Sequence, residues 1–274
     1  MVKNCNNTYK YSHFNLSYQQ FGSGERVMLC FHGYGESAEK YSFLGSSIGT
    51  DYTIYAFDFF HHGNSDTYNK DPSITMNGEL WAKLISNFLD ERSISTVDLL
   101  GYSMGGRLSL ALIQYIPERL QKITLLAPDG IYDSFWFQFA TRNFLGKRLF
   151  RNFTKNPNPY LSILNVLTRI KIFPTKLSQI AKINTSSEIN RKKVLATWMI
   201  LSQIKISIKR VEKSIAEHDL HLTISVGQYD KVISARKISN WKWVKYNNKN
   251  FIVANQGHLF TEAEVLSSLE KVNH

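Results

Sequence analysis

Short apolar runs that alternate with helical stretches are the feature that most restricts the fold of this chain. Four continuous apolar runs of strand length lie in its first half, and stretches compatible with helices separate them, at about residues 36–48, 76–89 and 107–115. The runs are residues 26–31, 53–57, 97–100 and 123–126. Because strands buried on both faces read as continuous apolar runs, this alternation predicts a mostly parallel, doubly wound α/β sheet with helices on both faces.

A long segment without strands interrupts the alternation. Residues 129–216 are mostly helical and amphipathic, and the strand pattern resumes at 220–226 and 250–254, before a closing helix over 261–272. The first segment, residues 8–21, alternates aromatic and polar residues, which predicts an antiparallel strand or hairpin. We therefore expect a core made of residues 1–128 and 217–274, with residues 129–216 inserted as a helical cap.

Composition and cysteine content restrict the class of protein. A chain of 274 residues that is 43% hydrophobic and 20% charged is typical of a globular enzyme and excludes disorder as the main description. No apolar run approaches the roughly 18 residues of a membrane span, and the N-terminus lacks the pattern of a secretory signal. Cys5 lies in a polar leader and Cys30 in an apolar run, so we expect no disulfide and a cytoplasmic location.

The positive charge of the chain is concentrated in one segment. The net charge is +11, and residues 129–214 alone carry 16 Lys and Arg against 4 Asp and Glu. This excess fits a solvated helical face, an anionic substrate, or transient contact with a membrane surface, since Lys147, Arg148 and Arg151 lie among Phe and Leu residues. No nucleic-acid-binding motif accompanies the basic residues, so we expect no nucleic-acid partner.

The strongest chemical motif is Gly-Tyr-Ser-Met-Gly-Gly at residues 101–106, between a predicted strand and a predicted helix. A sharp strand-to-helix turn would lift the Ser103 hydroxyl clear of the sheet and place it at the positive end of the helix. Side chains at the flanking positions would collide in such a turn, which explains Gly101 and Gly105. The pattern predicts Ser103 as a nucleophile.

These residues resemble the nucleophile elbow of the α/β-hydrolase family, and the resemblance covers nearly the whole chain. His-Gly-Tyr-Gly at 32–35 stands where the family carries its oxyanion loop, which implies that the N–H groups of Tyr34 and Met104 point at the carbonyl oxygen under attack. Residues 58–65 are similar to the family stretch D-x-x-G-H-G-x-S. Here His61 replaces a glycine, and we interpret His61 and His62 as scaffold.

The family order of nucleophile, acid and histidine indicates the other two site residues. Gly257-His258 follows the last predicted strand and matches the usual dipeptide, which makes His258 the general base. Asp230 lies in a turn that resembles G-x-x-D-x-x-[VI], and its task would be to accept the imidazole N–H. Some relatives carry the acid after the preceding strand, which leaves Asp129 and Asp133 as alternatives.

The resemblance implies a serine hydrolase that cleaves a carboxylic ester or thioester through an acyl-enzyme on Ser103, with a small-molecule substrate and no metal or organic cofactor. Two alternatives remain. Arg107 is a candidate substrate-binding residue, because similar elbows followed by arginine occur in menaquinone-pathway lyases that eliminate pyruvate; on a helix it could equally be solvated or ion-paired. The chain could also be a non-catalytic, ligand-binding member of the fold. The sequence does not indicate an oligomeric state.

Substrate choice in such enzymes depends on the cap and loops. The predicted cap is rich in aromatic residues, which could wall an apolar acyl pocket or form the packed face of its helices. These residues are Phe135, Trp136, Phe137, Phe139, Phe144, Phe150, Phe153, Tyr160, Phe173 and Trp198.

Overall fold

The computed structural model describes residues 6–65, 76–133, 135–171, 178, 182 and 185–270, without the side chain of Trp136. Cys5, Phe173 and the last two residues of the predicted helix 261–272 lie outside the described residues. By its internal contacts the chain divides into two compact units. Unit 1 comprises Met1–Tyr132 and Ile204–His274, and unit 2 comprises Asp133–Gln203.

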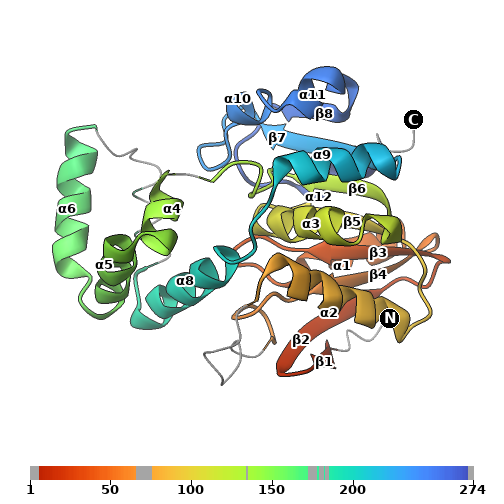
Figure 1. The fold of residues 1–274 in the computed structure, drawn as a ribbon, viewed down its shortest axis with the longest axis horizontal. Coiled ribbons are helices and arrows are strands. Elements are labelled where there is room, and N and C mark those ends of the chain that lie inside the picture. The colour runs from red at the N-terminus through yellow and green to blue at the C-terminus, as the bar shows by residue number, and fades with distance from the viewer. Residues whose placement is uncertain are drawn as a thin grey trace. The chain divides into compact units, whose positions relative to one another are not determined.

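Unit 1 is built on an eight-stranded sheet with the order β1-β2-β4-β3-β5-β6-β7-β8 (Figure 1). The pairs β1–β2 and β2–β4 are antiparallel, and every other neighbouring pair is parallel. The strands are β1 (Asn6–Tyr11), β2 (Phe14–Phe21), β3 (Arg26–Phe31), β4 (Tyr52–Phe57), β5 (Val97–Tyr102), β6 (Leu120–Leu126), β7 (His221–Gly227) and β8 (Phe251–Ala254). The prediction of a mostly parallel sheet is confirmed.

Helices cover both faces of this sheet. On one face α3 packs on β3, β5 and β6, with α2 and α9 on either side of it, while α12 packs on β6 and β7, and α1 on β2 and β4 (Figure 1). The helices of unit 1 are α1 (Ser42–Ser47), α2 (Gly78–Asp90), α3 (Met104–Tyr115), α9 (Ile208–Glu217), α10 (Ala235–Ile238), α11 (Lys242–Tyr246) and α12 (Glu262–Glu270). The described part of unit 1 also contains 3₁₀ turns at Ala38–Tyr41, Pro117–Arg119 and Asn248–Asn250. The doubly wound fold class is therefore confirmed.

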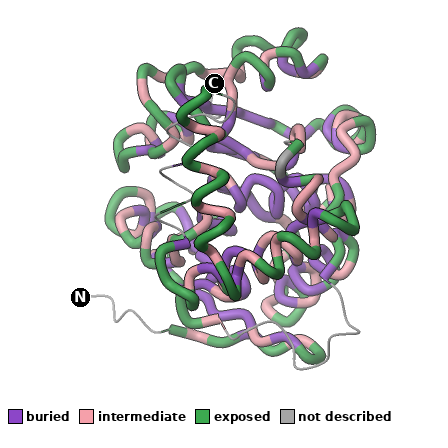
Figure 2. Tube along the Cα trace, turned by 90° about the vertical axis from the view of Figure 1, so that its left-hand side faces the viewer, coloured by how far each residue is buried: buried purple, intermediate pink, exposed green. Residues whose placement is uncertain are grey.

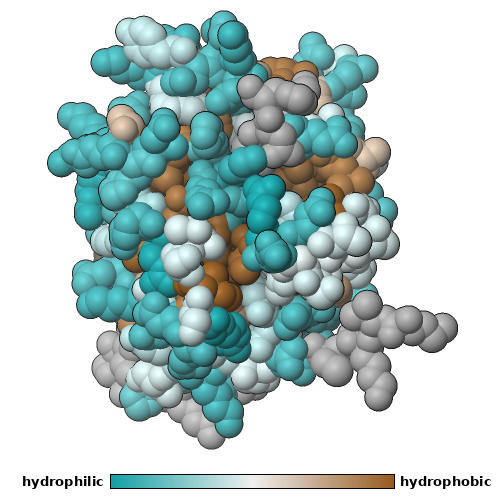
Figure 3. Space-filling model, turned by 90° about the vertical axis from the view of Figure 1, so that its right-hand side faces the viewer, coloured by the Kyte–Doolittle hydropathy of each residue, from teal (hydrophilic) through white to brown (hydrophobic). Residues whose placement is uncertain are grey.

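The core lies between the sheet and its helices. All six residues of β5 are buried, as a central parallel strand requires. Aromatic rings fill the space under α2, where Phe88 packs edge-on against Phe57 at a centroid distance of 4.9 Å and Trp81 against Phe31 at 5.5 Å. The surface seen from the right-hand side of Figure 1 is mostly hydrophilic, with hydrophobic residues visible between the polar ones (Figure 3).

Two helices differ from their predicted bounds. The helix predicted over 36–48 is a 3₁₀ turn followed by the short α1, because the sequence SFLGSS combines weak helix formers with a glycine. Helix α3 begins at Met104 instead of 107, since Gly105 and Gly106 fit within its first turn. Neither change moves the strand ends on which the site depends.

Unit 2 is helical in the part that the structure describes. It contains α4 (Phe135–Arg142), α5 (Phe144–Lys155), α6 (Asn158–Arg169) and α8 (Glu188–Leu201). Trp198 lies 5.5 Å from the rings of both Phe137 and Phe150, so these three aromatic residues form internal packing of the unit. By contrast, α6 has no buried residue, and its trace in Figure 2 is green and pink.

The division by contacts places residues 129–132 and 204–216 with the sheet, because Val211 and Ile215 of α9 are buried and α9 packs beside α3. The role of the inserted segment as a cap stays a prediction. Among the described residues, none of the helices combines the length and apolar character that a bilayer crossing requires.

Candidate active site

Three loops meet at the carboxyl edge of the parallel sheet. Ser103 directly follows β5, Asp230 lies three residues beyond β7, and His258 lies four residues beyond β8. Nε2 of His258 is 3.0 Å from Oγ of Ser103, and its Nδ1 is 2.7 Å from Oδ2 of Asp230. The structure thus brings together the three residues predicted to carry the chemistry, in one hydrogen-bonded chain.

The charge state of the carboxylate determines the direction of these hydrogen bonds. An ionised carboxylate only accepts, so Nδ1 of His258 carries the proton and donates it to Asp230. Nε2 is then the acceptor for the Ser103 hydroxyl. This is the tautomer in which an imidazole can remove a proton from a serine hydroxyl.

The side chain of Asp230 is fully buried and held by its own loop. Its Oδ1 accepts the backbone N–H groups of Val232 at 2.7 Å and Ile233 at 2.9 Å, which leaves Oδ2 for the imidazole. Charge-assisted bonds of this kind fix the carboxylate geometrically. The segment Gly-Gln-Tyr-Asp-Lys-Val-Ile therefore works as a turn that orients its acid.

The loops that carry Asp230 and His258 are tied to each other. The N–H of Gln228 donates to the carbonyl of Ala254 at 2.8 Å, and that of Tyr229 to Gln256 at 2.9 Å. The two loops therefore extend the pairing of β7 with β8 beyond the sheet. This contact sets the distance between the acid and the histidine.

The turn at Ser103 is strained in the way that the glycines predict. Ser103 has φ 50° and ψ −112°, outside the regions that a serine normally adopts. A Cβ on Gly105 would lie 1.9 Å from the carbonyl oxygen of Phe31, and one on Gly101 would lie 2.4 Å from Oγ of Ser109. At both glycines, therefore, an added side chain would collide with neighbouring atoms.

Tyr102, next to Ser103, is a residue of the candidate site that the sequence analysis missed. Its hydroxyl donates to the carbonyl of His258 at 3.1 Å, and its ring lies 5.4 Å from the imidazole. Burial, with the negative charges of Glu36 and Asp230, raises the pKa of this phenol, so the hydroxyl remains a donor at neutral pH. The tyrosine next to Ser103 was the available signal in the sequence, but the residue that it bonds lies 156 positions away.

Glu36 and Lys40 extend this contact to the glycine-rich loop after β3. Lys40 forms an ion pair with Glu36, and its Nζ lies 4.0 Å above the ring of Tyr102. Glu36 also accepts the N–H of Gly33 at 3.1 Å. A single network therefore connects the His-Gly-Tyr-Gly loop, the elbow and the histidine loop.

The two predicted oxyanion donors lie on the loop after β3 and at the start of α3. Met104 is the first residue of α3, where backbone N–H groups have no partner within the helix. Tyr34 packs edge-on against His62 at 5.2 Å, and burial raises the pKa of its phenol to about 12. Their assignment to an oxyanion hole stays a prediction.

Residues 58–65 form the scaffold expected of them. The buried Asp58 accepts the N–H of Ala38 at 2.7 Å and of Asn64 at 2.8 Å, which fixes two loops at once. His61 has φ 66°, a left-handed conformation that favours glycine, and this explains why its position is usually a glycine in the family. His62 is 1% exposed, and its Nδ1 lies 3.0 Å from the carbonyl oxygen of Phe60.

Arg107 is engaged in an ion pair. Its Nε and Nη2 lie 2.8 and 3.1 Å from the two carboxylate oxygens of Asp129, and its Nη1 donates to the carbonyl of Ile204 at 3.2 Å. Only 1% of this side chain is exposed. Substrate binding through Arg107 would require breaking this pair, so the ion-paired alternative describes the structure.

Both alternative acids are engaged in ion pairs. Asp129 is paired with Arg107, and Asp133 is paired with Arg142 at 2.7 Å.

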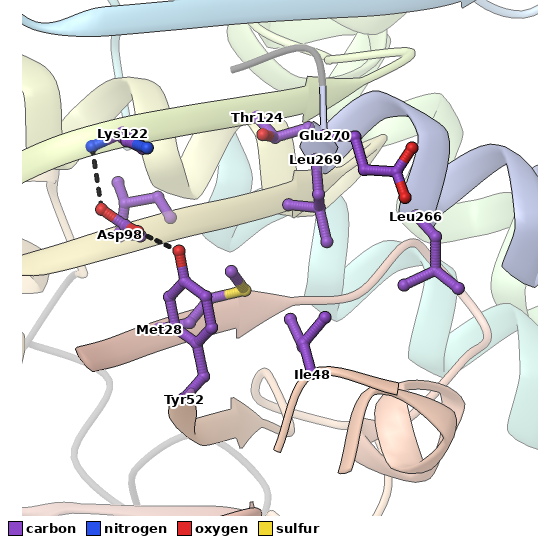
Figure 4. Close-up of a pocket in the computed structure, with 10 residues that line it drawn as sticks. Met28, Ile48, Tyr52, Asp98, Lys122, Thr124, Leu266, Leu269 and Glu270 are labelled. Atoms are coloured by element: carbon purple, nitrogen blue, oxygen red, sulfur yellow. Dashed lines mark hydrogen bonds between the residues drawn. The ribbon is translucent and has the colours of Figure 1, made fainter. Parts of the chain in front are cut away.

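A small cavity of about 80 Å³ lies at the other end of the strands. Asp98, near the start of β5, accepts hydrogen bonds there from Tyr52 at 2.7 Å and from the N–H of Lys122 at 3.0 Å (Figure 4). Leu266 and Leu269 of α12 close the other side. Because Ser103 follows the opposite end of β5, this cavity is separate from the hydrogen-bonded chain described above.

Within the described ranges, no group of three or more His, Cys, Asp or Glu residues could hold a metal ion.

The model of the α/β-hydrolase fold family matches residues 26–263, which include all three residues of the hydrogen-bonded chain. The chain belongs to the α/β-hydrolase fold family. Over 127 residues, the chain is 30% identical to 2-hydroxy-6-oxo-6-phenylhexa-2,4-dienoate hydrolase of Comamonas testosteroni. This match covers 44% of this chain and 42% of that protein. A Bacillus subtilis protein provisionally named 2-succinyl-6-hydroxy-2,4-cyclohexadiene-1-carboxylate synthase is 26% identical over 108 residues, or 38% of this chain and 36% of that protein.

A solved structure of a thermophilic esterase from Thermogutta terrifontis superimposes with a TM-score of 0.66 at 15% identity, covering all of both chains. At this identity the similarity shows the fold alone. The matched stretches span less than half the length of either curated relative. The comparisons therefore identify this chain as a member of the α/β-hydrolase family. Its relatives with hydrolase names are similar to it only at low identity.

Proposed function

We propose that this α/β-hydrolase family member is a serine hydrolase that cleaves a carboxylic ester or thioester through an acyl-enzyme on Ser103. The hydrogen-bonded chain from Asp230 through His258 to Ser103 is the observation that supports this proposal. A strained elbow, an imidazole in the correct tautomer and a buried acid are the parts that acyl transfer needs.

In the proposed reaction, Nε2 of His258 takes the Ser103 proton as Oγ attacks the substrate carbonyl carbon. The imidazolium, stabilised by Asp230, then gives that proton to the departing alkoxide or thiolate, which leaves the acyl group on Ser103. In the second half, His258 takes a proton from water as that water attacks the acyl carbon. The imidazolium then returns the proton to Oγ of Ser103 as the acyl–oxygen bond breaks, which releases the carboxylic acid and restores the free enzyme. No metal or organic cofactor enters this sequence.

We assign the N–H groups of Tyr34 and Met104 to the oxyanion that forms in both halves of the reaction. The position of Met104 at the N-terminus of α3 supports this, because helix N-termini favour developing negative charge. Each donor of this kind is worth about 3 kcal/mol of barrier. We also retain a cytoplasmic location as a proposal, with which the free, buried thiol of Cys30 is consistent.

Apolar side chains beside the proposed triad favour an apolar acyl or alcohol group. Tyr229 and Val232 flank Asp230, Leu259 follows His258, and all three are exposed. Apolar side chains of this kind can bind a hydrocarbon group of a substrate, because the contact removes apolar surface of both partners from water.

A fluorophosphonate probe tests the proposal directly. A serine activated as proposed should be labelled, and mass spectrometry should locate the adduct on Ser103. A screen of p-nitrophenyl esters of increasing chain length should then give measurable turnover, with medium chains preferred over acetate. The absence of both labelling and turnover would favour a non-catalytic, ligand-binding member of the fold.

A lyase remains the second candidate, favoured by the similarity to the Bacillus subtilis synthase. The same triad would then eliminate pyruvate from an anionic intermediate. The ion pair between Arg107 and Asp129 weighs against this candidate, because it occupies the arginine that suggested it. Release of pyruvate from such an intermediate, without turnover of simple esters, would select the lyase.

A further inference from the structure

Unit 2 carries most of the net positive charge of the chain. Residues 134–187 contain nine Lys and Arg and no Asp or Glu, and unit 2 as a whole has twelve basic and two acidic residues. It therefore holds +10 of the net +11. Its two acids are already paired, Asp133 with Arg142 and Glu188 with Lys192, each at 2.7 Å. Unit 2 thus has a large excess of positive charge.

Helix α5 exposes apolar and basic residues on the same side. Gly146 and Thr154 form its buried side, while Phe144, Leu145 and Leu149 are exposed, Phe144 by 82%. Arg148 and Arg151 lie four and seven residues beyond Phe144 and are also exposed, so they follow the same face of the helix. A face of this composition suits an interface in which hydrocarbon and anionic groups are close together.

Helix α6 exposes a narrow apolar stripe. Ile163, Val166 and the C-cap residue Ile170 follow the spacing i, i+3 and i+7, which places them on one side of the helix and its end, and each is more than half exposed. Arg169 and Lys171, both exposed, lie at the end of the stripe. The ring of Phe153 at the end of α5 lies 5.8 Å from that of Tyr160 in α6, so the two helices are neighbours (Figures 1 and 2).

We propose that these exposed faces of α5 and α6, the α5–α6 surface, bind peripherally to a bilayer that contains anionic phospholipid. Lys and Arg would contact the lipid phosphates, and the Phe, Leu and Ile side chains would enter the boundary between headgroups and acyl chains. The charge favours this partner over a second copy of the chain, because two copies of so basic a surface repel each other. The aliphatic stripe on α6 favours lipid over nucleic acid, which binds through stacking and phosphate contacts.

Vesicle sedimentation of the full chain tests the proposal without relying on catalysis. The protein should sediment with vesicles of equal parts phosphatidylglycerol and phosphatidylcholine, and at least tenfold less with pure phosphatidylcholine. Raising the salt from about 0.05 to 0.5 M should weaken binding, because the Debye length shrinks to a few ångströms. Equal binding to both vesicle types would overturn the proposal.

Two double variants separate the charge from the apolar contribution. Arg148→Glu with Arg151→Glu should lower the vesicle partition coefficient by more than about tenfold, because each basic residue near an anionic membrane contributes about fivefold. Ile163→Ser with Val166→Ser should lower it by about tenfold through lost burial. Lys245→Glu with Lys249→Glu makes the same charge change on exposed residues of unit 1 and should leave binding nearly unchanged. If the variant with both arginine substitutions binds the vesicles as well as the wild type does, the proposed surface is wrong.

Nucleic acid is the competing partner. Fluorescence anisotropy with a labelled single-stranded RNA of about 20 nucleotides should show weaker binding than the anionic vesicles. Nucleic acid would replace lipid as the partner if three results occur together. The wild type would bind vesicles poorly, the arginine substitutions would abolish RNA binding, and the Ile163 and Val166 substitutions would leave RNA binding intact. Circular dichroism verifies that each variant is folded, and the arginine variant decides the matter if the apolar variant unfolds.

Discussion

The hydroxyl of Tyr102 donates a hydrogen bond to the backbone carbonyl of His258 at 3.1 Å. Tyr102, the residue before Ser103, therefore holds the loop that carries His258. Because the same ring packs against the imidazole and beneath Lys40, movement of any one of these groups would disturb the other two. The contact makes Tyr102 a positioning residue for the proposed reaction.

Replacement of Tyr102 by Phe should lower kcat for p-nitrophenyl esters by about 2- to 10-fold with little change in KM. The substitution removes one hydrogen bond of roughly 0.5–1.5 kcal/mol and retains the ring. Steady-state rates with a medium-chain ester provide the measurement. Tyr246→Phe, at an exposed position, is the control, and a kcat for Tyr102→Phe equal to that of this control would remove the positioning role.

Replacement of Ser103 by Ala should abolish fluorophosphonate labelling and lower ester turnover by several orders of magnitude. The fold should remain, because the hydroxyl makes no contact that the sheet needs. Labelling by gel fluorescence and turnover by absorbance measure the loss, and Ser239→Ala, at another position, should behave as wild type. Ester turnover close to the wild-type rate would refute Ser103 as the nucleophile.

Replacement of Asp230 by Asn should lower kcat by about 10⁴-fold, since the amide would stabilise the wrong imidazole tautomer. The rate is measured with the same ester. Asp129→Asn tests the alternative acid: it should retain most of the activity and lose roughly 2–4 kcal/mol of stability, because the buried Arg107 would lose its charged partner. If kcat falls by about 10⁴-fold in Asp129→Asn while Asp230→Asn stays active, Asp129 is the acid and Asp230 is not.

Replacement of Gly105 by Ala should lower the free energy of unfolding by about 3 kcal/mol or more. The new Cβ would lie 1.9 Å from a backbone oxygen of β3, so a strand or a helix must shift. Thermal or urea unfolding measures the effect. At Gly257 an added Cβ meets no atom within 4 Å, so Gly257→Ala is the matched control for stability. Equal stability of the two variants would show that the elbow is not sterically constrained.

The local patterns of the sequence were sufficient to locate the strands, and the three residues predicted for the site are the ones that the structure joins in one hydrogen-bonded chain. β3 runs over the predicted residues 26–31, because a continuous apolar run requires burial on both faces wherever the strand lies in the sheet. Ser103, Asp230 and His258 each follow a strand, and the carboxyl ends of parallel strands share one edge. The family resemblance supplied their order along the chain.

Contacts between distant segments needed the tertiary structure. The sequence left open whether Arg107 is solvated, ion-paired or substrate-binding, because the carboxylate that pairs with it comes from the end of a neighbouring strand. The role of Tyr102 likewise depends on a carbonyl 156 residues away, and the order of the eight strands depends on which of them pair. Periodicity reports how each segment is buried, whereas the identity of the neighbour that buries it is a property of the folded chain.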